Sequence, residues 1–258
     1  MHQTDLTRLL WTAGFAATLT TGTAAQALVL NEVRHDDPGA DTEEYVELLG
    51  APGQSLEGLT FVVIGDDASD SKSGVIESVV SLDGLSLGAN GLFLLTSDVL
   101  GQETGFDPYI ASGPTDLTTD DLVLENGDNV TYLLVSGFTG ALGDDLDAVD
   151  ELSEPTLDVK PWASIIDVVS LFDGDNLGDF GSSEINYGPG EGFITLGPTG
   201  TFPPAHIYRL AGGGAWQIGE FAGAVLDTPG AQNVPTPATA ALLALGAAKL
   251  LGRRSSTR

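Results

Sequence analysis

Short runs of β-branched and aromatic residues recur along this chain, and no stretch carries a sustained helical period. Residues 130–135, for example, read Val-Thr-Tyr-Leu-Leu-Val, a mixture that strands prefer. Turn-forming residues separate the runs, as in Asp-Asp-Pro-Gly at 36–39 and Glu-Asn-Gly-Asp at 125–128. Many short strands divided by turns predict an all-β fold, either a sandwich or a barrel.

The pattern predicts strands at residues 28–34, 43–49, 60–65, 75–82, 91–96, 122–125, 129–135, 165–172, 206–210 and 216–221. Gly212, Gly213 and Gly214 are typical of a hairpin turn before the last of these strands. A long connection rich in glycine and proline occupies residues 179–204. We find no internal repeat and no linker between domains, so residues 28–233 are expected to share one core.

The charge of the chain is strongly negative, with a formal value of −28 at pH 7. Most of the basic residues lie in the terminal segments, and the central segment holds only Arg34, Lys72, Lys160 and Arg209. Such a surface repels nucleic acid, whose affinity for proteins comes mainly from phosphate contacts, and it repels anionic lipid. It attracts cations, or it keeps a protein soluble at high salt.

The chain has no cysteine, which excludes disulfides, thiolate catalysis and cysteine-based metal sites. Histidine is almost absent from the central segment, where only His35 and His206 occur. A hydrolase with a histidine base would therefore have to use one of these two residues.

The first 27 residues have the pattern of a secretory signal peptide. Arg8 supplies a positive n-region, and an apolar-to-small segment follows it. Ala25 and Ala27 bracket Gln26 in an A-x-A-like cleavage site, so the mature chain is expected to begin at Leu28.

Residues 234–258 form a second export element, made of a Pro-x-Pro segment, a short apolar run and a basic end. The run of about 14 residues spans about 21 Å as a helix, short of the roughly 30 Å of a hydrocarbon core. The positive-inside rule leaves the basic end in the cytoplasm and the central segment outside. We expect processing and orientation to depend on Val234, Pro235, Thr236, Pro237, Arg253 and Arg254.

This tail resembles the PEP-CTERM sorting signal of Gram-negative bacteria that make extracellular polysaccharide. That signal has a Val-Pro-Glu-Pro-like element, a hydrophobic helix and a basic terminus; here Thr236 replaces the usual glutamate. The resemblance implies an exosortase-type processing enzyme as a partner, transient contact with the inner membrane, and an outer-envelope or matrix location. The alternative is an ordinary single-pass C-terminal anchor.

The central segment resembles a lamin-tail domain. The matching stretches are Leu-Val-Leu-Asn-Glu-Val at 28–33, Glu-Tyr-Val-Glu-Leu at 44–48, residues 56–63, and Thr-Pro-Gly-Ala-Gln-Asn at 228–233. The resemblance implies an Ig-like β-sandwich in which residues 98–121 and 142–204 are long insertions. Bacterial members of the family are mostly surface or secreted modules.

Two acidic loops have spacings that suit calcium. Their candidate ligands are Asp173, Asp175, Asp179 and Glu184 in one loop and Asp145 and Asp147 in the other. Alternating oxygen ligands suit a hard cation, but the first loop has Leu177 where calcium loops carry Asp or Asn. A solvated acidic loop explains the same residues and is the simpler interpretation.

The sequence thus predicts three segments: a signal peptide (1–27), a β-sandwich body (28–233) and a sorting signal (234–258). No serine-hydrolase elbow, zinc-protease motif or phosphate-binding loop is present. The predicted function is that of an exported, non-enzymatic surface or matrix protein, with extracellular polysaccharide as a candidate partner. The alternatives are a secreted hydrolase of polysaccharide or phosphoester and a calcium-dependent adhesion module.

Overall fold

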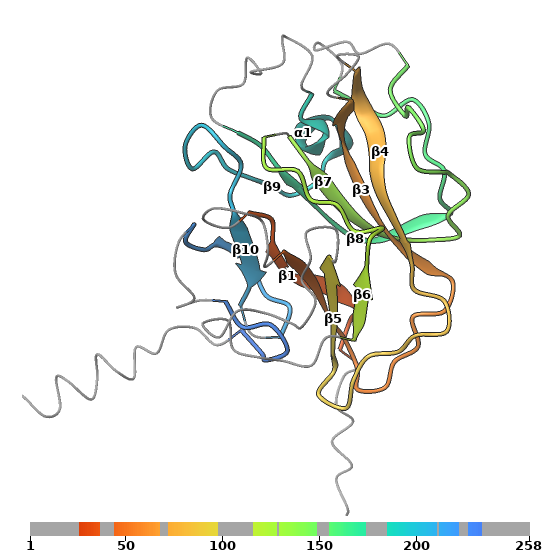
Figure 1. Cartoon of the computed structure of the whole chain (residues 1–258), viewed down its shortest axis with the longest axis vertical. Coiled ribbons are helices and arrows are strands. Elements are labelled where there is room, and N and C mark those ends of the chain that lie inside the picture. The colour runs from red at the N-terminus through yellow and green to blue at the C-terminus, as the bar shows by residue number, and fades with distance from the viewer. Residues whose placement is uncertain are drawn as a thin grey trace, which may run out of the picture.

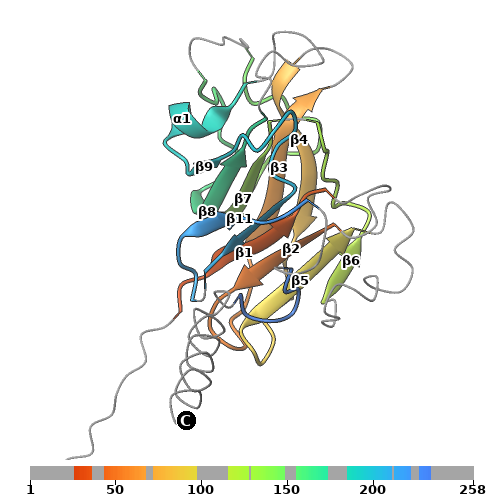
Figure 2. The ribbon, with the colours of Figure 1, turned by 90° about the vertical axis from the view of Figure 1, so that its left-hand side faces the viewer.

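Two mixed β-sheets face each other in a sandwich, as Figures 1 and 2 show from two sides. The computed structural model describes residues 26–36, 44–67, 72–97, 116–127, 129–148, 155–173, 185–210, 212–221 and 227–233. The predicted all-β body is confirmed at this level. Among these residues the longest helix, α1 (Tyr187–Glu191), has five residues.

The first sheet has six strands. Their order is β11 (Trp216–Ile218), β10 (His206–Arg209), β1 (Val29–Arg34), β2 (Tyr45–Leu49), β5 (Leu92–Ser97) and β6 (Leu117–Thr119). All neighbours are antiparallel except β5 and β6. The glycine-rich turn between β10 and β11 closes a hairpin, as predicted, with Gly212 and Gly213 at positive φ.

The second sheet has five strands. Their order is β4 (Lys72–Ser81), β3 (Leu59–Asp67), β7 (Thr131–Ser136), β8 (Ser164–Leu171) and β9 (Thr195–Leu196), and only β8 and β9 run parallel. β8 lies inside the range 142–204 that the family resemblance implies to be an insertion. It pairs with β7 over its length, so this part of the range belongs to the sheet itself.

Most of the expected strands form, but residues 122–125 do not. There the Ser78 hydroxyl accepts from Val123 N and donates to Val123 O, both at 2.8 Å, so a side chain of β4 takes the place of a backbone ladder. The short strands β6 and β9 were not predicted. Each has only two or three residues and is defined by its neighbour in the sheet, so its local sequence gives no alternation to read.

The main core lies between the sheets and includes Leu30, Phe61, Tyr132 and Ile207. A second apolar cluster, which includes Ile64, Leu133 and Tyr187, covers the outer face of the five-stranded sheet. The central strands of the five-stranded sheet are therefore buried on both faces. In the six-stranded sheet, every residue of β2 is buried as well. This explains why strands such as residues 44–48 show little alternation of polar and apolar residues.

A bidentate ion pair joins the two sheets. Arg209 Nη2 on β10 lies 2.9 and 2.8 Å from the two carboxylate oxygens of Asp167 on β8. Arg209 Nε also donates to Leu30 O at 2.8 Å, and Leu30 N donates to Asp167 at 2.9 Å. The guanidinium also lies 4.4 Å from the centre of the Trp216 ring. An ion pair, a hydrogen bond to the backbone and a cation–π contact therefore all hold the Arg209 side chain in place.

No helix in the described part of the chain is long and apolar enough to cross a membrane. The predicted C-terminal hydrophobic helix lies outside the described residues.

Candidate functional site

A buried polar network occupies the face of the six-stranded sheet that points away from the main core. Its position follows from a β-bulge: the register of β1 against β2 shifts between Leu30 and Glu32, which leaves Asn31 as the extra residue. Leu30 and Val33 both contribute to the core, whereas Glu32 contacts residues near the C-terminal end of the body. The bulge therefore places a carboxylate under the last segment of the body.

Glu32 is the centre of this network and is fully buried. Its Oε1 accepts from the Tyr45 hydroxyl at 2.5 Å, from His206 Nε2 at 3.0 Å and from Thr228 N at 2.9 Å. Its Oε2 accepts from the Thr228 hydroxyl at 2.8 Å. The donors that surround the carboxylate compensate for its removal from water.

His206 lies between two carboxylates. Its Nε2 faces Glu32, and its Nδ1 lies 2.9 Å from Asp227 Oδ1. Burial disfavours the charged imidazole, but the contacts to Asp227 and Glu32 outweigh burial, so the pKa of His206 is raised above 6.5. Nε2 is hydrogen-bonded to Glu32, whereas the approach of Nδ1 to Asp227 is an electrostatic contact outside hydrogen-bond geometry.

Arg34 is the second cation of the network and is also fully buried. Its Nη1 lies 3.2 Å from Asp227 Oδ2, and its Nη1 and Nη2 donate to Glu220 O at 3.1 Å and to Phe221 O at 2.8 Å. With His206 protonated, Arg34 and His206 balance the charges of Glu32 and Asp227. A buried group of charges is tolerated when its members are paired in this way.

Glu47 on β2 lies directly opposite Glu32 in the sheet. Its two oxygens accept from Asn31 Nδ2 at 2.7 Å and from Gly230 N at 2.6 Å. Burial, and next the negative charge of Glu32, raise the pKa of Glu47 to about 8, so the carboxyl is mostly protonated at neutral pH. Protonation avoids placing a second negative charge directly beside that of Glu32.

The segment 227–233 is held to the sheet at each of these points. Ala231 N donates to Thr228 O at 2.8 Å, which closes a turn with Pro229 and Gly230 at its centre, and Gly230 has the positive φ of 76° that a type II turn requires. Asn233 Nδ2 then donates to Asn31 O at 3.3 Å. The last described residue of the body is thus fixed to its first strand.

One ligand atom each from Glu32, His206 and Asp227 lies within 4.8 Å of the others, which would allow a metal ion. The protein itself already supplies cations to these atoms, because the imidazole bridges both carboxylates and Arg34 approaches Asp227. A divalent ion would have to displace these contacts and would repel the guanidinium. The geometry fits a self-contained ionic network better than a metal centre.

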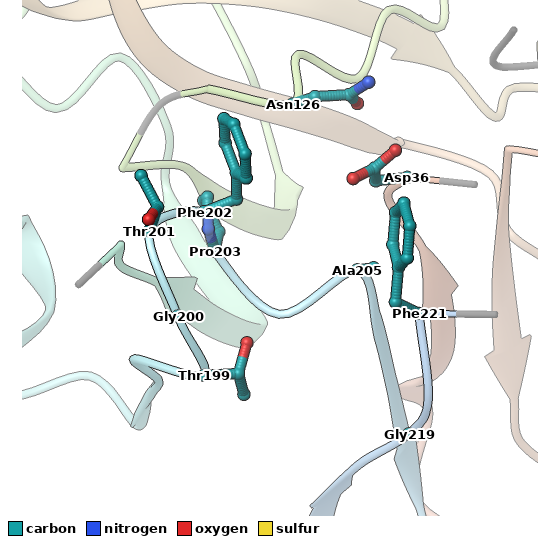
Figure 3. Close-up of a pocket in the computed structure, with 10 residues that line it drawn as sticks. All are labelled: Asp36, Asn126, Thr199, Gly200, Thr201, Phe202, Pro203, Ala205, Gly219 and Phe221. Carbon is teal, nitrogen blue, oxygen red and sulfur yellow. The ribbon is translucent and has the colours of Figure 1, made fainter. Parts of the chain in front are cut away.

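A hollow of about 490 Å³ opens next to this network, and Figure 3 shows its lining. Its walls come from Asp36 after β1, Asn126, the connection 199–205 before β10, and the residues after β11. Phe202 and Phe221 stand on opposite sides of the opening (Figure 3), and both are about half exposed, at 55% and 51%. Large exposed aromatic rings around a concavity are typical of a binding site.

The structure places the predicted calcium ligands in different surroundings. Asp147 is buried and its Oδ2 accepts from the Tyr187 hydroxyl at 2.9 Å, while Asp145 Oδ1 accepts from Asp147 N at 3.1 Å. Asp173 is buried at the end of β8, where its backbone N donates to Asn129 Oδ1 at 3.0 Å. The remaining candidates, Asp175, Asp179 and Glu184, lie outside the described residues. Calcium binding stays a prediction.

The processing residues lie almost entirely outside the described part of the chain. Ala27, at the predicted signal cleavage site, is exposed just before β1. Ala25 and the sorting residues Val234, Pro235, Thr236, Pro237, Arg253 and Arg254 are not described.

Sequence reasoning did not find the ionic network or the hollow. In the sequence, Asn31 and Glu32 belong to the lamin-tail-like stretch at 28–33 and His206 begins an expected strand, and neither pattern indicates that these residues meet. The scarcity of basic residues was a usable signal, because an arginine inside a predicted strand of so acidic a chain indicates a buried partner. No local pattern marks Phe202 and Phe221, which are brought together only by the fold.

Comparisons with family models, with curated protein sequences and with solved structures found no significant match to this chain. The function is therefore argued from the residues and their geometry.

Proposed function

We propose that this chain is an exported, non-enzymatic surface or extracellular-matrix protein whose body is an Ig-like, lamin-tail-like β-sandwich. In this proposal an N-terminal signal directs export and a PEP-CTERM-like tail is removed by an exosortase-type enzyme. The body then remains at the cell surface or in the matrix of a Gram-negative bacterium.

One observation carries the proposal: the residues behind the lamin-tail resemblance meet in space. Glu32 of the first motif accepts from Thr228 of the last, and Glu47 of the second motif accepts from Gly230. Asn31 O accepts from Asn233, the final residue of the last motif. Motifs almost two hundred positions apart in the chain thus form one network. This network supports a family relationship better than three separate strand-like matches do. The last described residue of this network, Asn233, directly precedes the predicted sorting element at Val234 in the sequence.

The surroundings of the two central histidines support a non-enzymatic role over the hydrolase alternative. His206 and His35 are both fully buried. Both nitrogens of His206 face carboxylates, and His35 Nδ1 lies 2.5 Å from the Tyr132 hydroxyl. Burial lowers the pKa of His35 to about 4. Neither imidazole is placed to take a proton from a substrate.

The test is the mass of the exported protein in a Gram-negative host that has an exosortase system. We expect a form that begins near Leu28 and ends near Pro235–Pro237. Replacing both prolines by alanine should leave the tail attached, while the same change at Pro52, in an exposed turn of the body, should not affect processing. Recovery of a form that still carries Arg258 outside the inner membrane would contradict the sorting proposal and favour a plain anchor.

A further inference from the structure

We propose that the hollow between Phe202 and Phe221 binds an amino sugar that carries a protonated amine, as one unit of a cationic glycan. The proposal builds on the extracellular location proposed above, where such a polymer is within reach. The binding itself is a property of the folded body and can be tested without that location.

The two phenylalanines supply the apolar part of the site. Their rings are about half exposed on opposite sides of a hollow of about 490 Å³, which is within the usual range of roughly 300–1,000 Å³ for small-ligand sites. The C–H face of a pyranose ring is apolar and slightly positive, so it packs well on the negative face of an aromatic ring. An ammonium group on the sugar is stabilised further by cation–π attraction to the same ring faces.

Polar groups also line the hollow. Thr199 and Thr201 offer hydroxyls, and Asn126 offers an amide on the same side of the hollow as Asp36 (Figure 3). Such groups match the hydroxyls of a sugar, whereas a simple alkylammonium has no hydroxyl to exchange hydrogen bonds with Thr199 and Thr201. This difference favours a sugar over a small hydrophobic cation.

The charge of the site favours an amine. Asp36 contributes a carboxylate, and none of the described residues that line the hollow is basic. The whole chain adds a strongly negative field, with a formal charge of −28. An anionic polysaccharide would be repelled, and a neutral sugar would gain nothing from this field.

The buried network holds the walls in place before any ligand binds. Arg34 donates to the backbone oxygens of Glu220 and Phe221, which fixes one wall. On the other side Ala205 O accepts from both His35 N and Asp36 N, at 2.8 and 3.1 Å. A preformed site avoids the entropic cost of ordering loops when a ligand enters.

The test is calorimetric titration of the purified chain with a β-1,4-linked glucosamine oligosaccharide and with its fully N-acetylated counterpart of the same length. Acetylation removes the charge and keeps the sugar ring. We expect the free-amine form to bind at least about tenfold more tightly, which corresponds to about 1.4 kcal/mol. Equal affinity for the two forms, or no binding of either, would overturn the proposal.

Variants separate the hollow from non-specific attraction to an acidic surface. Phe202→Ala and Phe221→Ala should each weaken binding about tenfold. Ile194→Ala, which truncates a side chain that is 52% exposed and does not line the hollow, should leave affinity unchanged. Asp36→Asn should reduce the preference for the free amine. Unchanged affinity in both phenylalanine variants would mean that the oligosaccharide adheres to surface charge, and the site would be rejected.

The two proposals fail independently. Processing is read from the mass of the exported protein, whereas binding is read from the purified chain. A correctly processed protein without affinity for the amino sugar would reject only the ligand, and an unprocessed chain that binds it would reject only the sorting route.

Discussion

Replacing Glu47 by glutamine should abolish the pH dependence that this residue gives to the stability of the body. Glu47 is fully buried, and its pKa is raised from 4.5 to about 8 by burial and by Glu32. Between these two values the folded state holds a proton that the unfolded state has lost. Stability from this group is therefore complete below pH 4.5 and declines as the pH rises to about 8.

The size of the effect follows from the shift. One pKa unit corresponds to about 1.4 kcal/mol. The raised pKa of Glu47 therefore lowers the free energy of unfolding by about 3 kcal/mol at pH 7 and by about 5 kcal/mol above pH 8. Glutamine removes this cost, but it offers one carbonyl oxygen to two donors, Asn31 Nδ2 and Gly230 N. The lost acceptor costs about 1–3 kcal/mol at every pH. The variant should thus be less stable than the wild type at pH 5 and more stable, by about 2–4 kcal/mol, at pH 8.5.

The assay is urea unfolding at several pH values, followed by the fluorescence of tryptophans that include the buried Trp216. Glu57→Gln, at an exposed position, removes the same formal charge and should give a curve parallel to the wild type. Other titrating groups affect all three proteins alike, so the difference between Glu47→Gln and wild type isolates this carboxyl. Two parallel curves from pH 5 to 8.5 would refute the account of Glu47.

Three further perturbations test the network and the acidic surface. Gly219→Ala would place a Cβ 2.0 Å from His206 Nδ1 and should lower the free energy of unfolding by at least about 2 kcal/mol. The control Gly200→Ala, where the new Cβ has no atom within 4 Å, should change it by less than about 0.5 kcal/mol. Similar losses in the two variants would show that the contact with His206 is unimportant. Arg34→Met leaves a buried carboxylate without its guanidinium and should cost about 3–5 kcal/mol, against about 1 kcal/mol for Lys160→Met, where the lysine that pairs with Glu191 is itself 45% exposed. A loss under about 1 kcal/mol at Arg34 would contradict the network. Sodium chloride should raise the melting temperature by screening repulsion, and calcium at equal ionic strength should add a further rise only if the acidic loops bind it; equal rises would remove the calcium hypothesis.

The sequence was sufficient to predict the fold class because strand propensity and turn chemistry agree along most of the chain. It was less informative where a strand is defined by its partners. Residues 122–125 carry a strand-like run, yet the Ser78 side chain takes the hydrogen bonds that a neighbouring strand would have supplied. The two residues of β9 show no strand pattern in the sequence, and they form a strand because they pair with the edge of β8.

The site could be predicted only in part, for a different reason. The motifs at 28–33 and 228–233 were visible as patterns, but their contact depends on the bulge at Asn31, which turns Glu32 toward Thr228. A bulge is a property of two paired strands and leaves no clear local signal in either of them. Phe202 and Phe221 likewise belong to separate connections, and only the packed sheets bring them to one hollow.

The use of basic residues connects these observations. Two of the few cations in the body, Arg34 and Arg209, point inward and pair with Asp227 and Asp167. One pair holds the last segment to the first strand, and the other joins the two sheets. Because both arginines are buried and paired with acidic partners, few basic side chains are left on the described surface, and a cationic partner meets little competition there. Salt screens exposed charges but leaves buried ion pairs largely intact. The two buried pairs therefore hold the last segment and the two sheets together over a range of salt concentrations, while the acidic surface stays available to cations.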